Sequence, residues 1–98
     1  MNTINHTKFP SQLRKHRKER GLKQKDVAQL IGIKNTTAIS RWEKGQNLPS
    51  LINTIKLSIV YHVLIDSLFI DLVRELRKEI HSRQQINNNK TTDKHESN

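Results

Sequence analysis

The feature that most constrains the fold of this chain is a pair of short apolar segments separated by a tight polar turn. The first segment, KQKDVAQLIG, carries Val27, Ala28 and Ile31 on one face of a helix, because these positions repeat at helical spacing. Gly32 follows directly, and glycine readily adopts the positive φ that a tight exit from a helix needs. The segment therefore predicts a short helix that ends at Gly32.

The second segment, AISRWEKG, contains the only tryptophan of the chain among charged residues. Ile39 and Trp42 lie one helical turn apart, and Gly45 suits the end of that helix. Two helices joined by so short a turn must cross closely, which requires a small residue such as Ala28 on the first helix and apolar residues on the second that reach back to it. The pattern predicts a helix-turn-helix unit with Ala28, Gly32, Ile39 and Trp42 inside, and with Ser40, Arg41 and Lys44 facing outward.

The rest of the chain also shows helical periodicity. No stretch alternates apolar and polar residues in the manner of a strand, so the predicted fold class is all-α with five helices. Pro10 suits a first helical turn and Gly21 suits a helix end. The first helix is therefore predicted at about Pro10–Arg20.

The C-terminal half predicts two further helices. Ser50 opens an apolar helix that breaks near His62, and the last helix is predicted from about Ser67 to Arg83, with Asp66 as its N-cap. Beyond it the chain is polar and has almost nothing to bury. The predicted organisation is a flexible N-terminus over 1–8, a helix-turn-helix domain over 9–69, a helical extension over 70–83 and a disordered polar tail over 84–98.

One apolar stretch raises the alternative of a membrane segment. Leu51–Val73 is rich in apolar residues but contains Lys56, His62, Asp66 and Asp71. A charged residue near the centre of a membrane helix costs about 2.5–3.5 kcal/mol, against about 0.3–0.6 kcal/mol gained per Leu or Ile. Insertion is therefore unfavourable, no membrane partner is expected, and the stretch is predicted to form helices of the core.

The positive charge of the chain is concentrated in its first half. The formal net charge is +9. From Lys8 to Lys44 the sequence has 11 Lys and Arg against 3 Asp and Glu, whereas residues 45–98 have 7 against 6. A basic region of this kind suits a polyanionic partner, either a nucleic acid or an anionic membrane surface, and the alternative is a well-solvated basic surface.

Several classes of function lack the residues they need. The chain has no cysteine, which excludes a disulfide scaffold, a thiol nucleophile and a cysteine zinc site, and MNTINHTKFP lacks the apolar core of a signal peptide. Both features favour the cytoplasm. No glycine-rich phosphate loop, paired carboxylates or nucleophile motif indicates an enzyme, and no cofactor is expected. The GxxG loop and exposed aromatic residues of common RNA-binding modules are also absent from the sequence.

The order of the motifs resembles one family. LRKHRKERGLKQKDVAQLIG, AISRWEKG, PSL and LIDSLF follow one another as in lambda-repressor-like domains of the Cro/C1 or XRE type, over about Phe9–Phe69. Several motifs in this order are far more specific than a lone helix-turn-helix pattern. The resemblance implies a domain that binds double-stranded DNA with its recognition helix in the major groove.

The resemblance also implies roles for individual residues. Arg17 and Glu43 match a partly buried ion pair that ties the first helix to the third, and Gln24 matches a glutamine that braces a DNA phosphate and the recognition helix. The expected base-reading residues are Thr36, Thr37, Ser40 and Arg41. The expected phosphate-binding residues, together with Gln24, are Lys23, Lys25, Lys34, Lys44, Gln46 and Asn47.

The sequence departs from the family pattern at a few positions. One extra residue between Gly32 and Ile39 leaves the base-reading register open by one position. His16 occupies a position that is usually apolar, and His62 replaces a common C-terminal glycine; both are expected to be packing or surface residues, not metal ligands. The N-cap of the recognition helix stays open among Asn35, Thr36 and Thr37.

The last predicted helix carries an apolar stripe that runs past the end of the resemblance. Its members are Phe69, Leu72, Val73, Leu76 and Ile80. The first part is expected to close the domain core, and Leu76 and Ile80 are predicted to form a homodimer contact with charged residues on its flanks. The alternatives are a helix end that folds onto its own domain and a site for another protein.

Taken together, these patterns predict a sequence-specific regulator of transcription that binds double-stranded DNA. The expected form is a repressor that binds an inverted-repeat operator as a homodimer. The alternative is the antitoxin of a toxin–antitoxin pair, which would bind a toxin through its C-terminal part and regulate its own synthesis on DNA.

Overall fold

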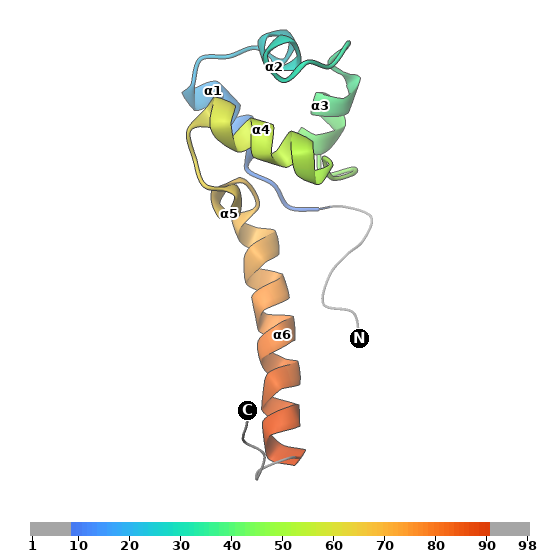
Figure 1. The fold of residues 1–98 in the computed structure, drawn as a ribbon, viewed down its shortest axis with the longest axis vertical. Coiled ribbons are helices and arrows are strands. Elements are labelled where there is room, and N and C mark those ends of the chain that lie inside the picture. Colours follow the sequence, from blue (N-terminus) through green and yellow to red (C-terminus); the bar gives the residue numbers. More distant parts are fainter. Residues whose placement is uncertain (1–8, 91–98) are drawn as a thin grey trace.

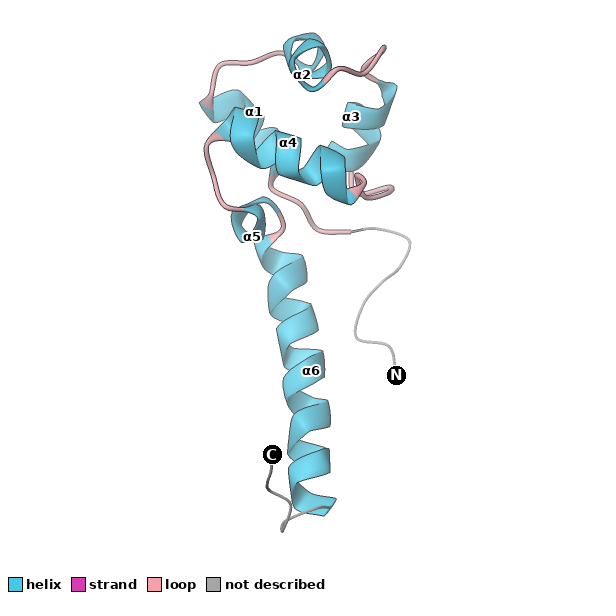
Figure 2. Ribbon diagram, viewed as in Figure 1, coloured by secondary structure: helices cyan, strands magenta, loops and turns pink. Residues whose placement is uncertain are grey.

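The computed structural model describes residues 9–90, and within them it contains six helices and no strand (Figures 1 and 2). The predicted all-α fold class is confirmed, with one helix more than expected. The flexible segment predicted over 1–8 and the last part of the predicted tail, residues 91–98, lie outside the described residues. The helices are α1 Leu13–Glu19, α2 Gln24–Ile31, α3 Thr37–Glu43, α4 Leu51–Tyr61, α5 Ile65–Leu68 and α6 Ile70–Lys90.

The first five helices enclose one apolar core, and α6 extends away from them (Figure 1). The buried hydrophobic residues come from every helix of the domain, which explains how helices of 4–11 residues remain ordered. These core residues are Leu13, Val27, Ala28, Ile31, Ile39, Trp42, Leu57, Tyr61, Leu68 and Phe69.

The structure corrects the start of the first helix. The segment before α1 runs between the ends of two other helices: the Phe9 N–H donates to the Gly45 carbonyl (2.7 Å) and the Gln12 N–H to the Leu68 carbonyl (2.8 Å). Gly45 has a φ of +75°, and a Cβ at this position would fall on the Phe9 carbonyl oxygen. Pro10 therefore lies in a connecting strap and not in a first helical turn, because the strap makes its hydrogen bonds to distant parts of the chain.

The predicted last helix is divided in two. Phe69 has the non-helical dihedral angles φ −134° and ψ 43° between α5 and α6, and its side chain is 8% exposed. The break lets this ring enter the core while α6 leaves the domain. Asp66 lies in the first turn of α5, whose N-cap is Leu64, so the predictions of an N-cap at Asp66 and of one helix from Ser67 are wrong.

The end of α6 also differs from the prediction. The helix continues to Lys90, so the prediction of a disordered tail is wrong for residues 84–90. Two side-chain pairs one turn apart support it: Gln85 Nε2 lies 3.2 Å from His81 Nε2, and Arg83 Nη2 lies 3.1 Å from Glu79 Oε2. Such pairs stabilise a helix without burying apolar surface.

α4 is apolar on two sides, and only one side faces the core. Thr54, Leu57 and Tyr61 are buried. On the other side Leu51 and Ile59 are 70% and 67% exposed. The prediction that the whole stretch packs into the core is therefore wrong for this face.

Lys56, the charged residue of α4, makes a hydrogen bond that joins α4 to α2. Its Nζ donates to the carbonyl of Ile31, the last residue of α2, at 3.0 Å. A cation at this place satisfies a carbonyl that α2 leaves free and complements the negative end of its dipole. Of the helices in the part of the chain that the structure describes, none is long and apolar enough to cross a membrane.

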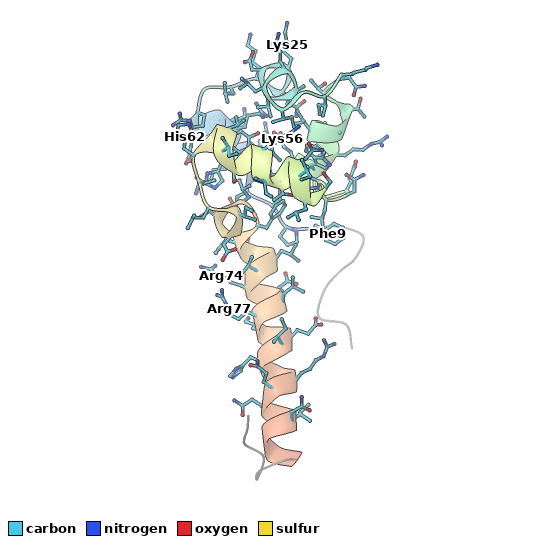
Figure 3. All side chains as sticks on the ribbon, viewed as in Figure 1. Phe9, Lys25, Lys56, His62, Arg74 and Arg77 are labelled. Carbon is cyan, nitrogen blue, oxygen red and sulfur yellow. The ribbon has the colours of Figure 1, made fainter. Side chains whose placement is uncertain are left out.

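The end of α4 generates a prediction on stability. His62 adopts φ 59° and ψ 43°, the left-handed conformation that favours glycine, and its side chain is exposed (Figure 3). Because glycine carries no Cβ to strain this conformation, His62→Gly should raise the free energy of unfolding by about 0.5–1 kcal/mol, which corresponds to a few degrees in Tm. Thermal unfolding by circular dichroism measures the change. His62→Ala, which keeps the Cβ, should give no such gain, and equal Tm values for the two variants would contradict this explanation.

Candidate nucleic-acid interface

The turn between α2 and α3 is held by hydrogen bonds at both of its ends. Gly32, with φ +82°, caps α2 and donates its N–H to the Ala28 carbonyl at 3.0 Å. At the other end Asn35 Oδ1 accepts the N–H of Thr37 at 3.0 Å. Asn35 is therefore the residue that makes the side-chain bond at the start of α3. Thr36 is partly buried, so Thr37 is the first exposed residue of the helix.

α3 turns one face to the core and the opposite face to solvent. Ile39 and Trp42 are 1% and 7% exposed. Helical geometry puts Thr37, Ser40 and Arg41 on the other side, and the structure leaves the first and last of these exposed and Ser40 partly exposed. The outward face of α3 therefore begins at Thr37. The extra residue between Gly32 and Ile39 had left this starting position open in the sequence.

A buried ion pair joins α1 to α3. Arg17 Nε lies 2.6 Å from Glu43 Oε2, and Arg17 Nη2 lies 3.0 Å from Glu43 Oε1. Arg17 Nη1 also donates to the Leu22 carbonyl at 3.0 Å, and Gln24 Nε2 donates to Glu43 Oε1 at 3.1 Å. Only 10% of the Arg17 side chain and 5% of the Glu43 side chain are exposed. Both charges are thus compensated by hydrogen bonds inside the protein, as a buried pair requires.

The pair also affects ionisation in its surroundings. The hydrogen bond to Glu43 raises the pKa of Arg17, although burial acts in the opposite direction. Burial raises the pKa of the Tyr61 phenol, and the negative charge of Glu43 adds to this shift. Arg17 therefore stays charged and Tyr61 stays neutral throughout the physiological pH range.

An open groove lies between the start of α1, the start of α2 and α3. Arg14 and Lys44 bring positive charge to it, and Ser40 and Gln24 bring polar side chains. Arg14 is a candidate phosphate-binding residue that sequence reasoning did not single out. The available signal was its spacing, one helical turn before Arg17 on α1.

The other expected phosphate-binding residues lie around α2 and α3. Lys23 and Lys25 are exposed at the start of α2, and Lys25 points away from the end of the domain that carries α6 (Figure 3). Lys34 is exposed in the turn before α3. The exposed residues that follow α3 are Lys44, Gln46 and Asn47. Of the expected phosphate-binding residues, only Gln24 donates a hydrogen bond to the Glu43 carboxylate of α3.

The comparison with protein families settles the class of this domain. A family model described as Helix-turn-helix, of the Cro/C1 or XRE type, matches residues 13–68, which run from the start of α1 to the end of α5. The chain belongs to this family. Helix-turn-helix proteins of this type are DNA-binding transcriptional regulators, and this chain is such a regulator.

Two solved structures are similar to this helix-turn-helix protein. The restriction-modification controller protein C.AhdI from Aeromonas hydrophila is 33% identical, with a TM-score of 0.53 over 59% of this chain and 86% of that chain. A transcriptional regulator from Listeria innocua is 21% identical, with a TM-score of 0.51 over 86% of this chain and 96% of that chain, and shows likeness of fold alone. No curated protein matches the chain.

The buried pair generates a prediction on stability. Glu43→Gln should lower the free energy of unfolding by about 3 kcal/mol, because it leaves the Arg17 charge buried without its counter-charge. Urea unfolding followed by circular dichroism measures the loss. The matched control is Asp71→Asn, whose partner Arg74 lies 3.7 Å away with both side chains at least half exposed. That change should cost less than about 0.5 kcal/mol. Equal effects of the two substitutions would contradict a buried, structural pair.

Proposed function

We propose that the chain is a cytoplasmic repressor that binds a specific inverted-repeat operator as a homodimer. The observation that carries the proposal is the outward face of α3. Its polar side chains oppose the buried Ile39 and Trp42, so α3 is locked to the domain while Thr37, Ser40 and Arg41 remain available. A single helix fits the major groove, where such side chains meet base edges.

The side chains of α3 have the chemistry for reading bases. Threonine and serine hydroxyls donate to or accept from either kind of base pair, and a threonine methyl can contact the methyl group of thymine. Arg41 is suited to a guanine, which accepts two hydrogen bonds from one guanidinium. Thr36 would contribute from the edge of the same face, where it is partly buried.

The basic residues around α2 and α3 would bind phosphate. The proposed residues are Lys23, Lys25, Lys34, Lys44, Gln46 and Asn47, with Gln24 and Arg14 at the groove beside α3. Each phosphate that a protein neutralises contributes about −0.9 to the slope of log K against log salt. For a dimer we expect a slope on the order of −5 to −8.

The proposed homodimer contact lies on α6. Leu76 and Ile80 are 40% and 54% exposed, and with Val73 they line a shallow apolar groove on this helix. Two copies of the stripe can cover each other, and flanking charges such as Arg77 remain at the rim. The similarity to C.AhdI, a controller protein, supports a regulatory role.

The first test concerns sequence specificity. Selection from a random pool of double-stranded oligonucleotides should give one consensus of two inverted half-sites, roughly 10 base pairs apart. Thr37→Ala and Arg41→Ala should each cost on the order of 1–3 kcal/mol at particular base pairs, because base contacts are specific. Lys25→Ala is the control and should weaken all sequences alike, with a salt slope smaller by about 1. Unchanged site preference in the α3 variants, or binding that is insensitive to salt, would contradict the proposal.

The second test concerns the dimer. Leu76→Glu combined with Ile80→Glu should yield a folded monomer with much weaker operator binding, since two added carboxylates per chain would oppose each other across the contact. Sedimentation equilibrium measures the association. A matched pair of single variants is Ile80→Glu and Ile86→Glu, because these side chains are 54% and 53% exposed and lie about 120° apart around the axis of α6. Only Ile80→Glu should weaken association. A wild-type chain that is monomeric at tens of micromolar, on DNA and off it, would contradict a homodimer and favour a partner such as a toxin.

A further inference from the structure

The strap that precedes α1, residues 9–12, connects two distant parts of the domain. It forms no helix, and all four of its residues are partly buried. Figure 1 shows it on the side of the domain from which α6 leaves. Its hydrogen bonds go to the end of α3 and to the end of α5, two places that are far apart in the sequence. The strap therefore joins the helix with the candidate base-reading residues to the helix that precedes α6.

At one end the strap holds the end of α3. The Phe9 N–H donates to the Gly45 carbonyl at 2.7 Å, and the Ser11 hydroxyl donates to the Trp42 carbonyl at 3.3 Å. The last carbonyls of a helix have no partners within it, so donors from another segment can fix where that end lies. The Trp42 side chain is 7% exposed, so its buried ring and the strap together hold α3 at this point.

Gly45 fits the strap more closely than its backbone conformation alone requires. Gly21, Gly32 and Gly45 all have positive φ, at 70°, 82° and 75°. A Cβ at Gly21 or Gly32 would meet no other residue within 4 Å, whereas the three atoms nearest to a Cβ at Gly45 are all backbone atoms of Phe9. The contact is between two stretches of backbone, so no rotation of a side chain can relieve a clash there.

At its other end the strap reaches the start of α6. The Gln12 N–H donates to the carbonyl of Leu68 at 2.8 Å. Leu68 is the last residue of α5 and is fully buried. Phe69 follows with non-helical dihedral angles, and α6 begins at Ile70. Four residues thus span from the end of α3 to the point where α6 leaves the domain.

We propose that the strap positions α3 relative to α6, and that Phe9, Ser11 and Gly45 are positioning residues for DNA binding by the dimer. The inference rests on the proposed homodimer through α6. In such a dimer the separation of the two α3 helices depends on how each α3 lies relative to its own α6. A loosened strap leaves each α3 able to bind one half-site, but the pair no longer holds the separation that two half-sites require.

Amide hydrogen exchange in the full chain, followed by NMR spectroscopy without DNA, tests whether the strap acts as one unit. Gly45→Ala should speed exchange of the Phe9 amide at least about tenfold, because the added Cβ displaces the Phe9 backbone. The Gln12 amide should speed up as well, because the strap is released from both ends together. The matched control is Gly21→Ala, which has a similar φ but adds its Cβ in open space, and it should change neither rate. A Gln12 amide that keeps its wild-type rate in Gly45→Ala would overturn the proposal.

The effect on DNA is tested with Phe9→Pro, which removes the N–H that binds Gly45. Its control is Phe9→Ala, which also removes the ring but keeps that N–H. With the operator selected from the random pool, Phe9→Pro should raise the Kd at least about tenfold relative to Phe9→Ala. With a duplex that carries a single half-site, the two variants should differ by less than about threefold. Phe9→Pro should also lose the preference for the selected spacing over one that is a base pair longer.

A second pair of variants addresses the hydroxyl of the strap. Ser11→Ala removes the donor to the Trp42 carbonyl, and Ser11→Thr keeps it. Ser11→Ala should weaken binding to the two-half-site operator more than binding to the single half-site, and Ser11→Thr should restore the wild-type ratio. Dimerisation measured by sedimentation equilibrium should be the same for all these variants, since none of them changes α6.

The outcomes separate this inference from the proposed function. Equal losses on both duplexes, with the spacing preference kept, would show that the strap only stabilises the fold and would overturn its positioning role. A wild-type chain that binds one half-site as a monomer would overturn the homodimer and the positioning role together. If no consensus operator emerges, the operator proposal fails, and the exchange rates of the Phe9 and Gln12 amides alone support or overturn the connection between α3 and α6.

Discussion

The buried ion pair between Arg17 and Glu43 is the contact on which the arrangement of α1, α2 and α3 depends. It joins α1 to α3, and the hydrogen bond from Gln24 adds α2 to the same carboxylate. A charge so enclosed is tolerated only when its partner keeps one geometry. The pair therefore fixes how α3 lies on the domain, and with it which of its side chains point outward.

Two apolar surfaces of the chain, by contrast, are exposed to solvent. One is the outer face of α4 and the other is the stripe on α6 around Leu76 and Ile80. Apolar exposure of this kind is typical of surfaces that contact another molecule. The outward face of α3 and these two apolar surfaces lie on different helices.

The parts of the fold and site that could be predicted have local causes. The positive φ of Gly32 and the one-turn spacing of Ile39 and Trp42 are visible within a few residues. The errors arose where a distant contact overrode a local preference. Pro10 suits a helix start, but its neighbours are bonded to Gly45 and Leu68, and Phe69 interrupts a helical pattern because its ring belongs to the core.

The sequence by itself determined the helical class, the helix-turn-helix unit and the basic character of the first half, because periodicity, glycine conformation and charge act over short stretches of chain. Only the tertiary structure decided that Asn35 accepts the N–H of Thr37 at the start of α3, that Arg14 reaches the groove beside α3, and that one side of α4 stays exposed. The identity of an apolar residue does not determine whether another part of the fold covers it. Its burial depends on which other helices arrive at that side, and that is a property of the assembled fold.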